Sequence, residues 1–219
     1  MRFSPKINHD SVLLEQLIRL GEGVSLDFKQ TISDQKKIAR TICAFANNKG
    51  GKLLVGVRDN GDIIGCEPEE EMYMLFEAAE HFCDPPVDIY FTIYELEDDI
   101  SVIEAEIKNS LKKPHFAIDE NDEWQIYMRS NDKTMMASSL SAKLIDRDED
   151  AEAITDSKQQ FVIDYLTTHE SITAKQLTLK LNLSLQRANR ILISLLQGGH
   201  ILHHKDNRGD YYSLRLEVN

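Results

Sequence analysis

The sequence predicts an α+β fold in two parts, a mixed α/β domain over residues 1–145 and a smaller domain over residues 153–219. A length of 219 residues suits two modest domains. Helical and strand patterns are interleaved in the first part, whereas the tail has three helical patterns followed by two short strand patterns. Charge divides at the same place: residues 1–150 carry 17 basic and 30 acidic side chains, and residues 151–219 carry eight and seven.

Periodic apolar positions, with glycine or proline stops between them, define the elements expected in the first domain. Apolar residues at helical spacing, Val12, Leu13, Leu17 and Leu20, predict the apolar stripe of the first helix. Strict alternation in the segment that follows predicts a half-buried strand. The expected helices cover residues 9–20, 34–48 and 68–83, and the expected strands cover residues 24–29, 52–57, 63–64, 87–96, 100–108 and 124–129.

The tail is predicted to contain three helices and a β-hairpin. Thr173 and Gln176 have the spacing of a capping box at the start of the second helix. Only Asn182 and Leu183 separate the second helix from the third, which is helix-turn-helix spacing. With the hairpin as a wing, the domain is predicted to be a winged helix-turn-helix. The helices are expected at residues 155–168, 173–181 and 184–197, the strands at 201–204 and 211–214, and the core at Phe161, Leu166, Leu177, Leu181, Ile191, Leu195 and Ile201.

Four side chains of the third helix are predicted to face outwards: Gln186, Arg187, Asn189 and Arg190. In helix-turn-helix proteins this helix enters the major groove, and these residue types read base edges or hold phosphates. Arg208, in the turn of the hairpin, could reach a phosphate or a minor groove. The favoured hypothesis is therefore a nucleic-acid-binding protein, a transcriptional regulator that binds DNA in preference to RNA. Because such proteins often bind two-fold sites, a homodimer is expected.

A protein-interaction or dimerisation module that binds no nucleic acid is the alternative for the tail. Phosphate neutralisation dominates affinity for nucleic acid, and the summed charge of the tail is close to zero. The formal net charge of the whole chain, −12, also argues against a protein coated in phosphate backbone.

The first domain contains a series of short motifs: Glu22, then Asp27-Phe28-Lys29, then AFANNKGG at 44–51, GVRDNGDIIG at 56–65, Lys113-Pro114-His115 and YMRSNDKT at 127–134. Together they resemble the Schlafen AlbA-like domain family over roughly residues 10–140. The run from residue 44 to residue 57 is the most specific part of the resemblance, and the Lys-Pro loop alone would be weak.

The resemblance implies a compact α+β domain associated with nucleic acids. Bacterial members of the family often carry a C-terminal helix-turn-helix and are described as transcriptional regulators. Some animal members look like metal-dependent ribonucleases that cut transfer RNA with three carboxylates, which implies an alternative function. By motif, those carboxylates map onto Glu22, Asp27 and Asp59, which would be both the catalytic and the metal-binding residues and would hold Mg²⁺ or Mn²⁺.

Two details count against that metal site. The family pattern has Glu where this chain has Asp27, so the carboxylate is one methylene shorter. The spacing from Glu22 to Asp27 puts the two on opposite faces of a regular strand, unless the chain bends at Gly23. Surface carboxylates on an acidic domain are the simpler interpretation. No cofactor is expected unless the nuclease hypothesis holds.

Lys112, Lys113, Arg129 and Lys133 are predicted to form a basic strip on the first domain, where RNA or DNA would lie. Scattered, solvated lysines are the alternative interpretation.

The segment Gly50-Gly51-Lys52 suggests nucleotide binding, but the Walker pattern is absent because Leu53 follows the lysine. The glycines follow a helix and precede a strand, so a helix cap and tight turn are favoured.

Composition excludes several classes of protein. Three cysteines without a CxxC pair predict neither a disulfide framework nor a thiolate zinc site. The first residues have no apolar segment typical of a secretory signal, and no stretch approaches the length of a membrane span. A cytoplasmic protein without a membrane partner is expected.

Overall fold

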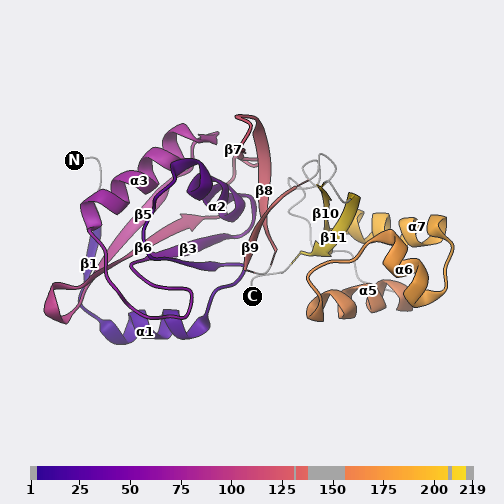
Figure 1. Cartoon of the computed structure of the whole chain (residues 1–219), viewed down its shortest axis with the longest axis horizontal. Helices are drawn as coiled ribbons and strands as arrows, with labels where there is room; N and C mark the ends of the chain where they lie inside the picture. Colours follow the sequence, from indigo (N-terminus) through magenta and orange to yellow (C-terminus); the bar gives the residue numbers. More distant parts are fainter. Residues whose placement is uncertain (1–3, 131, 138–155, 207–208, 216–219) are drawn as a thin grey trace. The chain divides into compact units, whose positions relative to one another are not determined.

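The computed structural model describes residues 4–130, 132–137, 156–206 and 209–215 (Figure 1). The chain divides into two compact units, one ending at Thr134 and the other beginning at Met135. The connector predicted at 138–152 lies outside the described residues.

A five-stranded sheet forms the centre of the N-terminal unit. Its order is β1-β5-β6-β3-β2, with parallel pairing of β1 with β5 and of β2 with β3, and antiparallel pairing elsewhere. Helix α1 covers one face of the sheet, and α2 and α3 cover the other (Figure 1). The elements are β1 (Lys6–Asn8), α1 (Ser11–Leu20), β2 (Leu26–Lys29), α2 (Gln35–Asn47), β3 (Gly50–Val55), α3 (Pro68–His81), β5 (Ile89–Glu95), a 3₁₀ turn (Glu97–Asp99) and β6 (Ser101–Lys108).

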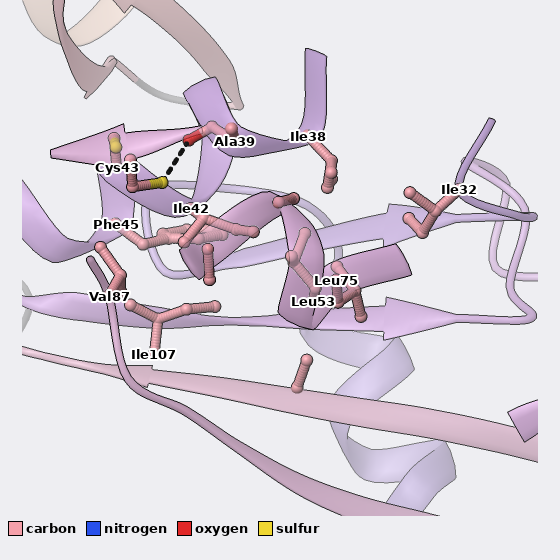
Figure 2. Close-up of a cluster of buried hydrophobic side chains, with 14 of the residues drawn as sticks. Ile32, Ile38, Ala39, Ile42, Cys43, Phe45, Leu53, Leu75, Val87 and Ile107 are labelled. Atoms are coloured by element: carbon pink, nitrogen blue, oxygen red, sulfur yellow. Dashed lines mark hydrogen bonds between the residues drawn. The ribbon is translucent and has the colours of Figure 1, made fainter. Parts of the chain in front are cut away.

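Helix α2 is buried along most of its length. Asp34 caps its first turn by accepting from the backbone N–H of Lys37, and nine of its 13 residues are buried. One side of α2 packs on the five-stranded sheet; Figure 2 shows Ile42 and Phe45 beside Leu53. A second sheet contacts α2, with the order β4 (Cys83–Asp84), β7 (Phe116–Ile118), β8 (Trp124–Ser130), β9 (Lys133–Met136). The helix therefore needs apolar residues around most of its circumference.

The C-terminal unit contains three helices and a hairpin, in the predicted order. Gln176 and Thr173 form the expected capping box, Asn182 ends the second helix in the left-handed conformation, and Ser184 caps the third. All seven predicted core residues belong to one apolar cluster, in which Phe161 and Leu181 are partly buried. The elements are α5 (Ser157–Thr168), α6 (Ala174–Leu181), α7 (Leu185–Gln197), β10 (Ile201–Asp206) and β11 (Gly209–Leu214).

The apolar stripe expected on the first helix is only partly in the core, because Leu17 packs against the apolar cluster around Leu14 whereas the other three residues of the stripe are exposed. Within α1 only Leu14 is buried, whereas Val12 is 61% exposed and Leu20 is 75% exposed. The helix touches the sheet with one narrow side, so helical spacing alone does not show which of its apolar residues are buried.

Three strand predictions also need correction. The residues of β2 from Leu26 to Phe28 are all buried, because a further layer covers the side that was expected to face solvent. The return strand expected at Ile63 and Ile64 is reduced to one antiparallel bridge between Val57 and Ile63. The short strands β1, β4, β7 and β9 were not expected, because segments of two to four residues carry too little periodicity.

No helix in the described parts of the chain has both the length and the apolar composition needed to span a bilayer.

The C-terminal unit is predicted to fold without the rest of the chain. A fragment of residues 153–219 should melt cooperatively, because its helices and hairpin share one core. Replacing Leu195, which is 1% exposed, with Ala should lower the free energy of unfolding by about 2–5 kcal/mol. Circular dichroism of both fragments during urea denaturation measures the difference. A fragment without a cooperative transition would show that this core depends on other residues.

Candidate functional site

Helix α7 presents a polar, basic surface to solvent. Gln186, Arg187 and Arg190 are exposed and Asn189 is half-buried, while Ala188, Ile191, Leu192, Leu195 and Leu196 are buried. The helix therefore separates its two faces as predicted, and the four polar residues could be replaced without opening the core.

The charge around α6 and α7 is more favourable to an anion than the summed charge of the tail. No acidic residue lies between Glu170 and Asp206, and this segment contains five basic residues. Lys175 and Lys180 on α6 are exposed, as are Arg187 and Arg190 on α7. Lys180 also lies over the ring of Tyr165 on α5, with its Nζ 4.3 Å from the ring centroid. A count of charge by segment would have shown this clustering, whereas the sum over 69 residues hid it.

Some exposed side chains on these helices are apolar. Leu179 on α6 is 84% exposed, and Leu185 and Ile193 on α7 are 50% and 43% exposed. They were not predicted as surface residues. Arg208, predicted at the tip of the hairpin, lies outside the described residues.

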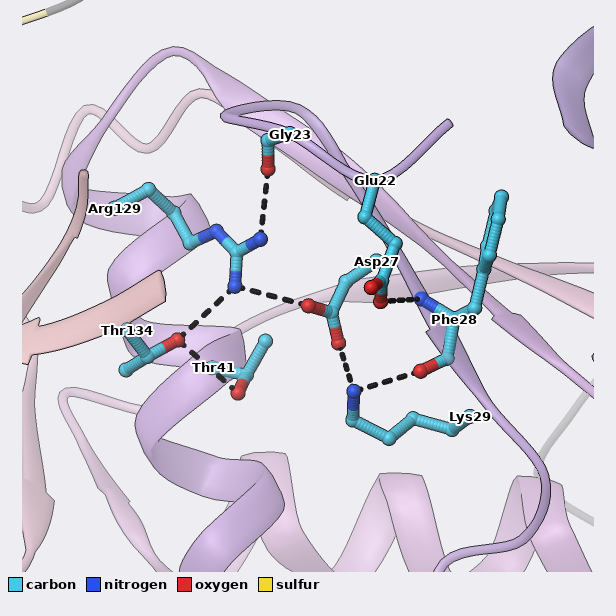
Figure 3. A network of polar contacts seen from close by, with 8 residues as sticks. All are labelled: Glu22, Gly23, Asp27, Phe28, Lys29, Thr41, Arg129 and Thr134. Carbon is cyan, nitrogen blue, oxygen red and sulfur yellow. Dashed lines mark hydrogen bonds and ion pairs between the residues drawn. The ribbon is translucent and has the colours of Figure 1, made fainter. Parts of the chain in front are cut away.

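In the N-terminal unit, Glu22 and Asp27 are occupied by partners from the protein itself (Figure 3). The chain bends after Glu22, where the N–H of Gly23 donates to the carbonyl of Leu26, and Glu22 Oε1 accepts from the N–H of Phe28 at 2.8 Å. Asp27 is 4% exposed and pairs with Arg129 and Lys29. Asp59, the third residue of the predicted set, is exposed.

These contacts do not fit a metal site. No group of three or more His, Cys, Asp or Glu side chains in the described part of the chain is placed to hold a metal ion. Asp27, the buried carboxylate of the three, already faces two cationic groups, and its charge is balanced without a metal.

Arg129 lies in the interior and not in an exposed basic strip, which corrects the prediction. It is 2% exposed, and its guanidinium donates to Asp27 Oδ1 at 3.0 Å and to the carbonyl of Gly23 at 2.7 Å. The same group lies 4.9 Å from the centroid of the Phe45 ring and donates to Thr134 Oγ1. The pattern of alternating residues in a strand could not distinguish this buried arginine from a solvated one.

The other members of the predicted strip remain near the surface. Lys112 and Lys133 are exposed and Lys113 is half-buried. The Lys-Pro loop that carries two of them is fixed from inside by His115, whose Nδ1 lies 2.7 Å from the carbonyl of Pro85 and whose Nε2 lies 2.6 Å from Ser110 Oγ. A carbonyl only accepts, so Nδ1 carries the proton and Nε2 accepts from the serine hydroxyl.

Gly50 and Gly51 are required by packing. A Cβ on Gly51 would lie 2.2 Å from the Phe45 ring, and Gly50 has a positive φ of 87° with Ile107 O only 2.6 Å from its Cβ position. The glycine pair therefore lets β3 approach α2 and β6, in agreement with the tight-turn interpretation.

The molecule thus consists of an α+β domain with an internal arginine–aspartate pair and a three-helix unit with a basic outer surface. Residues 22–138 match the family model described as Schlafen, AlbA_2. This match covers more than half of the chain, and the chain belongs to that family, as the motifs predicted.

Two solved structures resemble this chain at low identity. The DIP2311 protein of Corynebacterium diphtheriae is 17% identical with a TM-score of 0.43, and the alignment covers 88% of this chain and 34% of that protein. This chain therefore spans about a third of the length of the DIP2311 protein. The N-terminal domain of a protein from Nitrosomonas europaea, described as related to the ATP-dependent DNA helicase RecG, is 20% identical with a TM-score of 0.41; the alignment covers 52% of this chain and 82% of that domain.

Removing one partner of the Asp27–Arg129 pair should destabilise the N-terminal unit. Arg129→Met leaves a buried carboxylate with only Lys29 beside it, and the loss expected for breaking a buried pair is about 3–5 kcal/mol. The exposed pair of Lys36 and Asp122 provides the control, because Lys36→Met should cost less than about 1 kcal/mol. Urea unfolding followed by the fluorescence of Trp124, the single tryptophan, measures both. Equal, small effects would mean that Arg129 is solvated.

The stability of the N-terminal unit should fall in mild acid through His115. Burial lowers the pKa of His115 below its ordinary value of about 6.5. The unfolded chain therefore takes up the proton first as pH falls. The stability contributed by the neutral ring is complete above about pH 6.5 and is lost as pH falls through the lowered pKa of the folded state.

This effect is measured by urea unfolding at about pH 8 and about pH 5.5. The difference between the two pH values should be smaller in His115→Gln than in the unmodified protein. An unchanged difference would assign the acid sensitivity to other groups.

Proposed function

We propose that this protein binds nucleic acid through its C-terminal unit, and that it is a transcriptional regulator which contacts duplex DNA. In this proposal α6 and α7 are a helix-turn-helix and the hairpin of β10 and β11 is its wing. The three-residue connection between the helices, with Asn182 in the left-handed conformation and Ser184 as the next cap, supports that assignment.

The observation that carries the proposal is the position of the charge. Four exposed basic residues lie on α6 and α7, within a segment that has no acidic residue. Phosphate contacts supply most of the affinity of a protein for nucleic acid, and acidic neighbours would oppose them. The N-terminal unit has the opposite balance, because most of the acidic side chains of the chain belong to it.

The arrangement suggests a division of roles among these residues. Gln186 and Asn189 have side-chain amides that can pair with base edges, and Arg190 lies one turn after Gln186. Lys175, in the first turn of α6, is placed where a helix N-terminus and a cation can hold a phosphate together. A homodimer on a two-fold site completes the proposal.

Replacing Arg187 and Arg190 together with Ala should weaken duplex binding at least tenfold at fixed salt, because one lost bidentate contact of about 1.4 kcal/mol or more is enough for that factor. Both side chains are exposed, so the melting temperature should not change. The Lys36→Ala, Lys37→Ala double variant removes the same charge from α2 and should keep its affinity.

The measurement is a titration of labelled duplex at two salt concentrations, beside a melting curve for each variant. Affinity of the unmodified protein should fall steeply with salt. Equal affinity of the unmodified protein and the Arg187, Arg190 variant would show that α7 is not the helix that contacts the DNA. If no duplex binds at low salt, the exposed Leu179, Leu185 and Ile193 instead favour a protein-interaction or dimerisation module.

A further inference from the structure

A second basic site lies in the N-terminal unit, at one end of the five-stranded sheet. A pocket of about 390 Å³ opens between the last turn of α1, the start of β3 and the end of β6. Its volume is within the range of small-molecule sites. It lies on the face of the sheet that carries α1, the face opposite to α2.

Three lysines line this pocket in a domain that is otherwise strongly acidic. They are Lys49, Lys52 and Lys108, with Asn109 beside them and Glu106 as the acidic residue of the wall. Two carboxylates lie close to these lysines, Glu106 in the wall and Glu104 at 2.7 Å from Lys52 Nζ, so three lysines against two glutamates leave one local positive charge. Charges more than about 10 Å away are screened at physiological salt. The site therefore favours an anion.

The three lysines do not have the same freedom. Lys52 Nζ is 2.7 Å from Glu104 Oε1, and Tyr94 holds the other oxygen of that carboxylate, so Lys52 is largely committed. Lys108 Nζ lies 4.2 Å from the centroid of the Tyr90 ring, which lines the neighbouring pocket and not this one, so an anion bound here would have to draw Lys108 away from that ring. Lys49 is exposed. Lys49 is thus the accessible cation of this pocket, and Lys108 is the second cation that an incoming anion would recruit.

The opposite wall is apolar. Leu17 and Leu20 from α1 and Leu26 from β2 line it, and Leu20 is 75% exposed. Part of the apolar stripe of α1 therefore lines this pocket and does not belong to the core, although its helical spacing is that of a core-facing stripe. A pocket that combines apolar side chains with lysines suits a ligand with one planar apolar part and one phosphate.

We propose that this pocket binds a nucleotide, with the phosphate on Lys49 and Lys108 and the base against Leu17 and Leu20. The nucleotide could be free or could be the phosphorylated end of a nucleic-acid strand, because the same chemistry occurs in both. This site does not use the glycine–lysine segment as a phosphate loop, since Lys52 is held by Glu104 and the two glycines are explained by packing.

The test is calorimetric titration of the full chain with nucleoside monophosphates, the matching nucleosides and inorganic phosphate. A monophosphate should bind at least about tenfold more tightly than its nucleoside. Lys49→Gln with Lys108→Gln should reduce that affinity at least about tenfold, while Lys36→Gln with Lys37→Gln, on the other face of the sheet, should not. Leu20→Ser should lower the affinity for the monophosphate and leave the affinity for inorganic phosphate unchanged. Because Leu20 is 75% exposed, this substitution should not unfold the protein.

The arms of the experiment also distinguish the two sources. If a 5′-phosphorylated single strand binds more tightly than the monophosphate, and the Lys49, Lys108 variant loses affinity for both to the same extent, the ligand is a strand end. If the monophosphate binds more tightly than the strand, the ligand is a free nucleotide. The absence of saturable binding at millimolar concentration, or equal losses in both lysine pairs, would overturn the proposal. Arg187 and Arg190 lie outside this pocket, so their replacement should leave nucleotide affinity unchanged whether or not duplex binding fails.

Discussion

Burial of α2 between two sheets is the constraint on which the N-terminal unit depends. A helix covered on both sides leaves no water for the polar groups around it, so a polar group left there without a partner costs free energy. Asn47 donates from its amide to the carbonyls of His115 and Tyr127, and accepts from the N–H of His115. Arg129 packs on Phe45 and pairs with Asp27, which joins β8 to β2. The family motif around residues 44–51 is thus a set of packing and hydrogen-bonding requirements.

This constraint separates the polar residues that stabilise the fold from those free to bind a ligand. Asp27 and Arg129 belong to a motif that suggests chemistry, yet each is neutralised by the other in the interior. Glu22 is committed to a main-chain N–H. Accessible cations lie elsewhere, among them those on α6 and α7 and Lys49 in the pocket beside α1. Binding of phosphate-bearing ligands at those two places needs no rearrangement of the buried network.

Much of the fold could be predicted from the sequence, because long periodic segments and caps are local signals. The capping box at Thr173, the cap at Ser184 and the outward face of α7 follow from residues within a few positions of one another. The burial of Arg129 could not be predicted, since its partner Asp27 is 102 residues away and only the tertiary arrangement brings them together. The burial of α1 could not be predicted for a related reason: helical spacing indicates an apolar face, but not whether that face covers a core or a pocket. The clustering of charge between Glu170 and Asp206 was readable, but only when counted locally.

We propose that the C-terminal unit carries the affinity of this protein for duplex DNA. The most direct measurement compares the full chain with a fragment of residues 153–219 in titrations of the same labelled duplex over a series of salt concentrations. If the claim is right, the fragment keeps the salt dependence of the full chain, because the same phosphates are neutralised by the same residues. Its affinity per binding unit should be equal or higher, since the acidic N-terminal unit is gone. A folded fragment that binds no duplex, while the full chain binds it, would contradict the claim and place the DNA-binding surface in the N-terminal unit.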